Sequence, residues 1–403
     1  MAPKVKFFCL HYRLIIIGLL IFQFSQAQNN FSKLDDWLDN NVSNLGGRAV
    51  LLVWKDGKTV YENAANELTK KQKFIGKRIA KKTGRDIDLS DFDANTKQRI
   101  ASCSKWLSAA LAMTFVDEKK FSLEDSIGKF LPVMTANGKG NIKVWHCLSH
   151  LTGIKQIGIM DAMNNGKENG GGSFRERMQQ KQDGNSNNKL NPWNSMQDAM
   201  DSIAKTEMEG EPGKTFHYGN AGLQIIAAIC EIVGKKDFET LFQERIAKPL
   251  KMKDTDFGNV RVPLAAGGAF STPNDYLNFL QMILHDGKFN GKQIISKQSI
   301  INMQKNYVTK DCKISYSPVE ANNWGYGFGE WVMDSLTPTL SKGEGVKRSN
   351  AVTSPGLFGT FPWVENEKKY CAILFTLNIK SKGRGERYKE LKQLVDESFE
   401  IRK

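Results

Sequence analysis

The sequence predicts an α/β (α+β) fold in which one antiparallel sheet is formed from both chain ends and is flanked by helices. Three observations support this prediction. Alternating strand-like residues surround Asp56-Gly57, three further strand-like stretches lie towards the C-terminus, and the residues between them follow helical spacing. We therefore expect a sheet subdomain made of residues 28–101 and 261–403, with a mainly helical subdomain, residues 102–260, inserted between its two halves.

The strands are identified by alternation and by a turn signal. In RAVLLVWKDGKTVYEN, residues 48–63, an Asp-Gly pair separates two alternating stretches, which is the strongest short-range signal for a β-hairpin. Three later stretches, GYGFGEWVMD, GLFGTFPWVE and KYCAILFTLN, are interpreted as further strands. At the end of the chain, residues 385–403 place four apolar side chains on one helical face: Tyr388, Leu391, Val395 and Phe399.

The middle of the chain is predicted to be helical. Apolar residues recur at helical spacing after Ser102. The stretch GLQIIAAICEIVG is apolar nearly all round, which is typical of a buried helix, and Gly234 is expected to be its C-cap. In the amphipathic stretch TPNDYLNFLQMILHDG, Thr272 or Asn274 is expected to cap the helix, with Pro273 in its first turn.

A cleft is expected at the junction of the two subdomains. Residues 160–192 are rich in Asn, Gly and Gln and poor in apolar residues. This composition predicts a mobile loop, and it leaves open whether the loop covers the cleft or is only an insertion.

The first 27 residues are typical of a cleaved export signal. Lys4, Lys6 and Arg13 form a basic region, residues 14–22 are apolar, and small residues precede Gln28. The alternative is a membrane anchor, but the apolar run is shorter than the roughly 20 residues needed to cross a bilayer. We therefore expect cleavage near Ala27 and a periplasmic or secreted protein.

The chain of 403 residues carries a formal net charge of +14. Residues 1–27 hold three positive charges and no negative ones, so cleavage would leave +14 minus 3, or +11. Much of the excess lies in residues 70–85, which contain eight Lys or Arg and no acid. A weak association of this run with an anionic envelope is one interpretation, and a solvated insertion is the other. No nucleic acid partner is expected, because neither stacking aromatics nor a nucleic-acid module accompanies the run.

Metal ligands are sparse. His146 and His150 lie one helical turn apart with Cys147 between them, but no third or fourth ligand is evident and no C-x-x-C pair occurs. The sequence therefore predicts no metal site. Cleavage would leave five of the six cysteines, and an odd number at irregular spacing argues against a disulfide framework, although a single disulfide stays open.

Ser102 and Lys105 are the candidate nucleophile and base. Four S-x-x-K pairs occur, and only this one begins a long apolar helix; those at Ser126, Ser186 and Ser202 lie in a linker, an Asn-rich loop and a polar stretch. A serine at a helix N-terminus with lysine one turn further on has a base within reach and backbone N–H groups directed at a developing oxyanion. The alternative is that Ser102 is a simple N-cap and Lys105 a surface residue.

Tyr218 and Asn220 form the second candidate pair. Y-x-N also occurs at Tyr61 and Tyr276, but only in EPGKTFHYGNAG does it follow a Pro-Gly turn and precede a buried helix. Residues on such a turn can project into a cleft, and the alternative for Tyr218 is an ordinary buried tyrosine. His217 suggests a Ser-His-Asp alternative, which is weak because the chain has no G-x-S-x-G elbow.

These stretches resemble the serine β-lactamases and penicillin-recognising serine hydrolases, on the branch of the class C β-lactamases and related esterases. RIASCSK followed by FSLEDSIGKFLP is similar to the nucleophile helix and the segment after it. IKVWHCLSHLTGI is similar to the next helix and its turn, with His150, Thr152 and Gly153 in place. PGKTFHYGN carries the Tyr-x-Asn pair, and RIAKPLKMKDT and AAGGAFSTPNDYLNF resemble two further signatures. The resemblance covers most of the chain after residue 27 and implies a β-lactamase/transpeptidase-like fold.

The resemblance also implies a mechanism. Ser102 would be acylated after giving its proton to Lys105, whose pKa must be lowered by its surroundings. Tyr218 would share the proton path and protonate the leaving group, while Asn220 orients Lys105 and the substrate. The backbone N–H groups of Ser102 and Leu357 would form the oxyanion hole. The implied substrate is a small molecule or a short peptide, and no cofactor is needed.

The third motif of this family is Lys-Thr-Gly or His-x-Gly, and the matching positions here are Ser354, Pro355 and Gly356 in TSPGLFGTFPWV. A cation there would pair with a substrate carboxylate, whereas Ser354 supplies only a neutral hydrogen bond or is a plain strand residue. We therefore expect an esterase or amidase rather than an efficient β-lactamase. Two alternatives stay open: a catalytically inactive cell-envelope binding protein with the same fold, and an anion-binding protein that acts through residues 70–85.

Overall fold

The computed structural model describes residues 31–83, 89–155, 193–321, 323–335 and 349–400. The predicted signal peptide and the predicted loop at 160–192 lie outside the described residues. Within the described ranges, no helix combines the length and the apolar character needed to span a bilayer.

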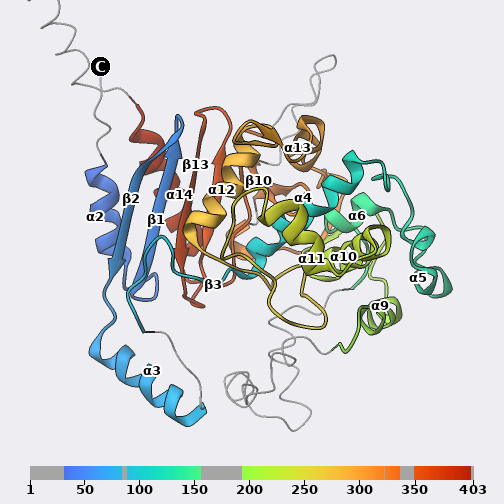
Figure 1. Ribbon diagram of the computed structural model, residues 1–403, viewed down its shortest axis with the longest axis horizontal. Coiled ribbons are helices and arrows are strands. Elements are labelled where there is room, and N and C mark those ends of the chain that lie inside the picture. Colours follow the sequence, from blue (N-terminus) through green and yellow to red (C-terminus); the bar gives the residue numbers. More distant parts are fainter. Residues whose placement is uncertain (1–30, 84–88, 156–192, 322, 336–348, 401–403) are drawn as a thin grey trace, which may run out of the picture.

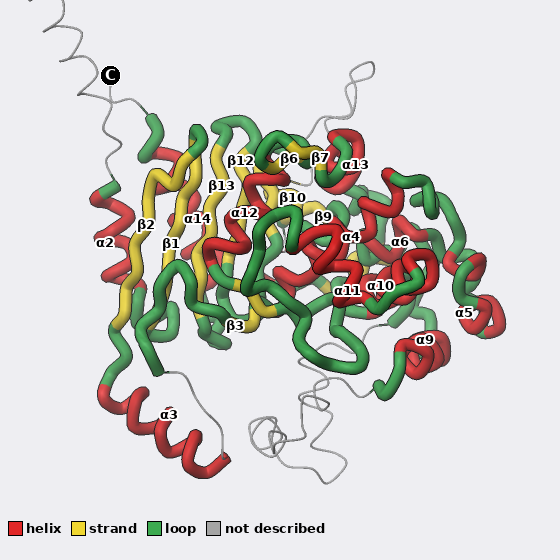
Figure 2. Tube along the Cα trace, viewed as in Figure 1, coloured by secondary structure: helices red, strands yellow, loops and turns green. Residues whose placement is uncertain are grey.

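A seven-stranded antiparallel sheet forms the framework of the protein (Figures 1 and 2). Its strand order is β2-β1-β13-β12-β11-β10-β9. The strands are β1 Arg48–Lys55, β2 Lys58–Asn66, β9 Trp324–Tyr326, β10 Trp331–Ser335, β11 Ala351–Thr353, β12 Phe361–Glu365 and β13 Tyr370–Thr376. Strand β1 pairs with β13 from Ala49 opposite Thr376 to Lys55 opposite Tyr370. The predicted fold class, with one antiparallel sheet built from both chain ends, is confirmed.

The hairpin β1–β2 has the turn that its sequence predicts. Asp56 and Gly57 connect the strands and have φ values of 50° and 86°. Positive φ at both central residues is typical of a type I′ turn, whose twist matches that of the flanking strands.

Helices cover both faces of the sheet and fill the region beside it (Figure 1). The helices are α2 Ser32–Asn41, α3 Lys70–Thr83, α4 Ser104–Asp117, α5 Pro132–Ala136, α6 Val144–Leu148, α9 Met196–Lys205, α10 Ala221–Gly234, α11 Phe238–Phe242, α12 Pro273–Leu284, α13 Lys297–Met303 and α14 Arg384–Glu397. The short strands are β3 Gln98–Arg99, β4 Thr215–His217, β5 Phe270–Ser271, β6 Lys288–Phe289, β7 Lys292–Gln293 and β8 Lys313–Tyr316.

The alternation in β1 explains how the sheet separates two hydrophobic clusters. Val50 and Leu52 pack in the cluster that contains α4, α10 and α12. Ala49, Leu51 and Val53 pack in the cluster that contains α2 and α14. Because successive side chains of a strand point to opposite faces, one buried strand contributes to both cores.

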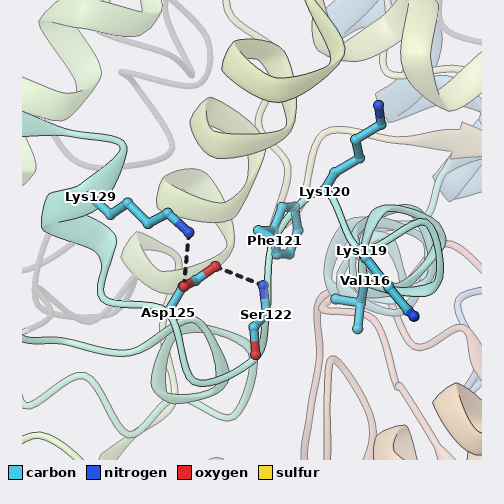
Figure 3. Close-up of a pocket in the computed structure, with 7 residues that line it drawn as sticks. All are labelled: Val116, Lys119, Lys120, Phe121, Ser122, Asp125 and Lys129. Atoms are coloured by element: carbon cyan, nitrogen blue, oxygen red, sulfur yellow. Dashed lines mark hydrogen bonds and ion pairs between the residues drawn. The ribbon is translucent and has the colours of Figure 1, made fainter.

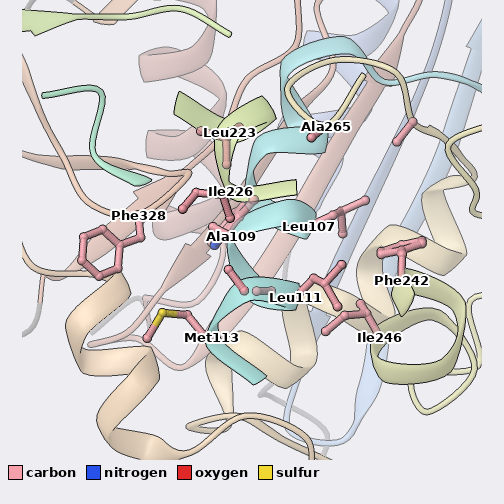
Figure 4. Packing of buried hydrophobic residues seen from close by; sticks show 14 of the residues in the cluster. Leu107, Ala109, Leu111, Met113, Leu223, Ile226, Phe242, Ile246, Ala265 and Phe328 are labelled. Atoms are coloured by element: carbon pink, nitrogen blue, oxygen red, sulfur yellow. The ribbon is translucent and has the colours of Figure 1, made fainter. Parts of the chain in front are cut away.

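Helix α4 runs through the larger cluster and is buried along nearly its whole length. Figure 4 shows Leu107, Leu111 and Met113 of α4 among apolar side chains that include Leu223 and Ile226 of α10. A helix that is surrounded by other elements must be apolar on every side, which is the pattern in its sequence. This packing gives the residues at its N-terminus a rigid support.

Two local predictions can be compared with the structure. Thr272 is the N-cap of α12, and its hydroxyl accepts a hydrogen bond from the backbone of Asp275. The prediction of Gly234 as the C-cap of α10 was wrong, because the left-handed residue is Lys235, with φ of 53°. A Cβ at position 234 would instead lie 2.7 Å from a methyl carbon of Leu241, so close packing explains this glycine.

Candidate active site

Ser102 lies in a 3₁₀ turn, Ala101–Cys103, that leads directly into α4. Ala101 has a positive φ of 46°, a conformation that costs a non-glycine residue roughly 1–2 kcal/mol. The turn is held from the other side by the buried Tyr276, whose hydroxyl donates to the backbone carbonyl of Cys103 at 2.9 Å. The Ser102 side chain is therefore half-buried on a fixed backbone.

Lys105 lies one turn along α4 and its side chain faces Ser102. Its Nζ atom is 3.2 Å from Ser102 Oγ, 3.3 Å from Asn220 Oδ1 and 2.8 Å from the carbonyl oxygen of Ala266. The residue is only 1% exposed, and these three contacts are all with neutral groups. Burial lowers the pKa of Lys105 from 10.5 to about 7, because the charged ammonium loses its hydration. A substantial fraction of the amine is therefore neutral near pH 7.

Tyr218 follows β4 and its ring lies beside the lysine. The ring centroid is 4.8 Å from Lys105 Nζ, and the backbone N–H of Tyr218 donates to the carbonyl of Tyr316 at 3.1 Å. Burial raises the pKa of the Tyr218 phenol, and its hydrogen bond with Ser102 offsets part of this rise. The phenol therefore stays protonated at neutral pH and can pass a proton on.

Aromatic rings pack against the side of Tyr218. The His150 ring centroid lies 4.9 Å from that of Tyr218, and the Trp331 ring centroid lies 5.0 Å from it. Burial lowers the pKa of His150 well below its usual value, so its imidazole is neutral. These contacts hold the Tyr218 ring in place without adding charge to the site.

The segment that matches the third motif lies directly against the nucleophile turn. Ser354 is 1% exposed, and its hydroxyl is 2.9 Å from the carbonyl of Gly329 and 3.3 Å from that of Ser102. A Cβ at Gly356 would lie 2.4 Å from the carbonyl of Ile100, so only glycine allows this approach. Leu357 is the second residue of the turn that begins at Gly356, and its side chain is half-buried.

The structure thus brings Ser102, Lys105, Tyr218 and Asn220 together and places Ser354 and Gly356 against the backbone around Ser102. Three supporting residues were not identified from the sequence: Ala266, Tyr276 and Gly329. Gly329 has φ of 74°, and a Cβ there would lie 2.4 Å from the carbonyl of Lys105. Two glycine-rich stretches could have indicated this region: AAGGAF, which contains Ala266, and GYGFGE, which contains Gly329. Glycine is typical of places where two backbone segments approach closely.

The other sequence candidates lie elsewhere. Ser202 is exposed on α9, and Ser186 is outside the described residues. His146 accepts a hydrogen bond at Nδ1 from the backbone of Lys143, and His217 Nδ1 is 2.6 Å from Glu209. These contacts give both histidines structural partners within the described chain.

A surface pocket of about 370 Å³ lies at the opposite end of α4 (Figure 3). It is lined by Val116, Lys119, Lys120, Phe121, Ser122, Asp125 and Lys129. The 14 residues of α4 correspond to roughly 20 Å, so this pocket is remote from Ser102. An ion pair of 3.0 Å between Lys129 and Asp125 accounts for two of its charges.

The antiparallel sheet, the helices on both of its faces and the serine at the start of the central helix together define a serine hydrolase. The chain belongs to the β-lactamase family, because residues 38–395 match the family described as Beta-lactamase.

Individual relatives are distant. Protein Rv1367c of Mycobacterium tuberculosis is 25% identical over 329 residues, which cover 69% of this chain and 75% of that protein. The D-alanyl-D-alanine-carboxypeptidase/endopeptidase AmpH of Escherichia coli is 20% identical, over 53% of this chain and 55% of AmpH. Among solved structures, EstCE1, a hydrolase with promiscuous acyltransferase activity, superposes with a TM-score of 0.66 at 17% identity, over 92% of this chain and 99% of EstCE1.

Proposed function

We propose that the protein is an exported serine hydrolase that cleaves an ester or amide bond through an acyl-enzyme on Ser102. The observation that carries this proposal is the buried amine of Lys105, which lies 3.2 Å from Ser102 Oγ and has its pKa lowered to about 7. A neutral amine at this distance can accept the hydroxyl proton as the nucleophile attacks. The activities named for AmpH and EstCE1 both involve acyl groups, which supports the same reaction class here.

The proposed reaction has two halves. In the first, Ser102 Oγ bonds to the carbonyl carbon, its proton moves to Lys105 Nζ, and the leaving group departs with a proton relayed through the Tyr218 hydroxyl. In the second, a water molecule gives a proton to Lys105 Nζ while its oxygen bonds to the carbonyl carbon of the acyl-enzyme. The bond between this carbon and Ser102 Oγ then breaks, Ser102 Oγ recovers a proton along the same path, and the acid is released. The backbone N–H groups of Ser102 and Leu357 are proposed to donate to the oxyanion that forms on the substrate carbonyl. Each such donor stabilises the transition state by about 3 kcal/mol.

We propose esters or amides of small molecules or short peptides as substrates, rather than β-lactams. The Ser354 hydroxyl lies within hydrogen-bond distance of the carbonyls of Gly329 and Ser102, so its proton is directed at the backbone. It therefore gives a substrate carboxylate neither a cation nor a free donor at this position. Export is proposed from the pattern of residues 1–27, which precede the described residues.

A fluorophosphonate reagent tests the nucleophile. We expect covalent labelling of the wild-type protein at Ser102 and none of Ser102→Ala. Ser202→Ala is the matched control, because Ser202 also precedes a lysine by three residues on a helix but is exposed. Labelling that survives in Ser102→Ala would refute the assignment.

Substrate class is tested with p-nitrophenyl esters, D-amino-acid amides and a chromogenic cephalosporin. We expect turnover of esters or amides that exceeds turnover of the cephalosporin and is lost in Ser102→Ala. A folded wild-type protein that neither labels nor turns over any of these compounds would instead be the inactive binding protein.

A further inference from the structure

Helix α3 is a separate feature that the proposed reaction does not use. It extends away from the sheet beyond the end of β2 (Figure 1). Its start is fixed by a reciprocal pair of hydrogen bonds, in which the Gln72 backbone donates to Thr69 Oγ1 and the Thr69 backbone donates to Gln72 Oε1. Gly76 packs against Leu89, where a Cβ would lie 2.7 Å from a methyl carbon. One side of α3 is therefore anchored, while the rest is presented to its surroundings.

The outward side of α3 combines cations with an exposed aromatic ring. Phe74 is 65% exposed, and Ile75 beside it is 41% exposed. The residues three and four positions before and after Phe74 are its neighbours on the helix surface, and all of them are basic. These neighbours are Lys70, Lys71, Lys77 and Arg78.

Within the described residues, the cations of this surface have no acidic partners. Residues 69–83 contain no acid. In the part of the chain that the structure describes, none of the ion pairs involves Lys70, Lys71, Lys77 or Arg78. These cations are therefore available to an external polyanion without competition from an ion pair among the described residues.

We propose that this face of α3 binds the surface of an anionic phospholipid membrane. Lysine and arginine side chains attract lipid phosphates, and an apolar ring among them is stabilised by entering the boundary between headgroups and acyl chains. A single-stranded nucleic acid is matched less well, because its binding sites use several aromatic rings along a groove, whereas α3 has one. The proposal accounts for the exposed Phe74, which attraction of charges alone leaves unexplained.

Vesicle co-sedimentation of the full chain tests this proposal. Vesicles of phosphatidylcholine are compared with vesicles in which about a third of the lipid is phosphatidylglycerol. We expect binding to the anionic vesicles that falls as salt is raised from about 0.05 to about 0.2 M. Binding to phosphatidylcholine alone measures any contribution of the apolar residues 14–22, which are unchanged in every variant.

Two sets of variants separate the cations from the ring. K70Q/K71Q/K77Q/R78Q should weaken binding at least about tenfold. Its control is K248Q/K251Q/K253Q/K288Q, which removes the same charge from exposed lysines elsewhere and should leave most of the binding intact. Phe74→Ser should weaken binding about tenfold, while Ile379→Ser, at a residue that is 59% exposed, should not.

The proposal is overturned by equal binding to both kinds of vesicle, or by equal losses in the two four-cation variants. It is also overturned if Phe74→Ser binds as the wild type does, or if an oligonucleotide binds α3 more tightly than the anionic vesicles do. Ester hydrolysis and thermal unfolding of each variant confirm that it is folded, because α3 lies outside the proposed catalytic residues.

Discussion

The Ser354 hydroxyl lies 3.3 Å from the backbone carbonyl of Ser102 and so connects the segment after β11 to the nucleophile turn. The same hydroxyl is 2.9 Å from the carbonyl of Gly329, beside β10. A neutral residue at this position thus joins three segments that meet at the site. The role proposed for Ser354 is to position the nucleophile backbone.

Ser354→Ala should lower the free energy of unfolding by about 1–2 kcal/mol, because the buried carbonyl of Gly329 loses its hydroxyl donor and the contact with the carbonyl of Ser102 is lost as well. It should also lower kcat more than it raises KM, since the backbone of Ser102 loses a constraint but no substrate contact is removed. Denaturant unfolding and steady-state kinetics on an active ester measure both effects. Ser354→Thr, which keeps the hydroxyl, should recover part of the loss. A rise in KM alone would indicate direct substrate contact.

The acid limb of the pH profile should report Lys105. We expect kcat/KM to rise about tenfold per pH unit below about pH 7 and then to level off, because only the neutral amine accepts the proton. Tyr218→Phe should lower the plateau value of kcat/KM by about 10²-fold or more, and the acid limb should stay at the same pH. His217→Asn should also keep it, which excludes this imidazole as its source. If the acid limb shifts to another pH in His217→Asn, the assignment of this limb to Lys105 is contradicted.

The stability of the protein should depend on the same group. The folded pKa of Lys105 is about 7 and its ordinary value is 10.5, so between these pH values the unfolded chain binds the additional proton. Stability therefore rises with pH across this window and does not gain further above it. Relative to Lys105→Met, the free energy of unfolding of the wild type should rise by a few kcal/mol between about pH 7 and about pH 10. Urea unfolding of both proteins at several pH values measures the difference, and parallel curves would contradict it.

Gly329→Ala should be strongly destabilising. Its φ is 74°, and the new Cβ would lie 2.4 Å from the carbonyl of Lys105 and 2.7 Å from the Cβ of Ala109. We expect a loss of more than about 2 kcal/mol together with a loss of activity. Gly57→Ala is the matched control, because its φ is 86° but no atom lies within 4 Å of the added carbon. It should lose only the roughly 1 kcal/mol attributable to backbone strain. Equal losses would show that steric contact at Lys105 is unimportant.

Much of the fold could be predicted because its signals are local. The Asp56-Gly57 turn, the apolar helix after Ser102 and the cap at Thr272 each follow from a few neighbouring residues. Helix α3 was not predicted, because its run of lysines was interpreted only as a solvated or anion-binding segment. The pairing of Lys105 with Ala266, and of Ser354 with the Ser102 carbonyl, depends on segments distant in sequence that leave no periodic pattern. The proximity of Ser102 and Lys105 was predictable because one helical turn separates them.

The pairing of β1 with β13 has a consequence for how the molecule is made. Strands separated by more than three hundred positions must meet before the sheet is complete, and such high contact order slows folding. The N-terminal hairpin therefore pairs with β13 only after the last part of the chain has been synthesised. Truncating the final strand should therefore prevent completion of the native state.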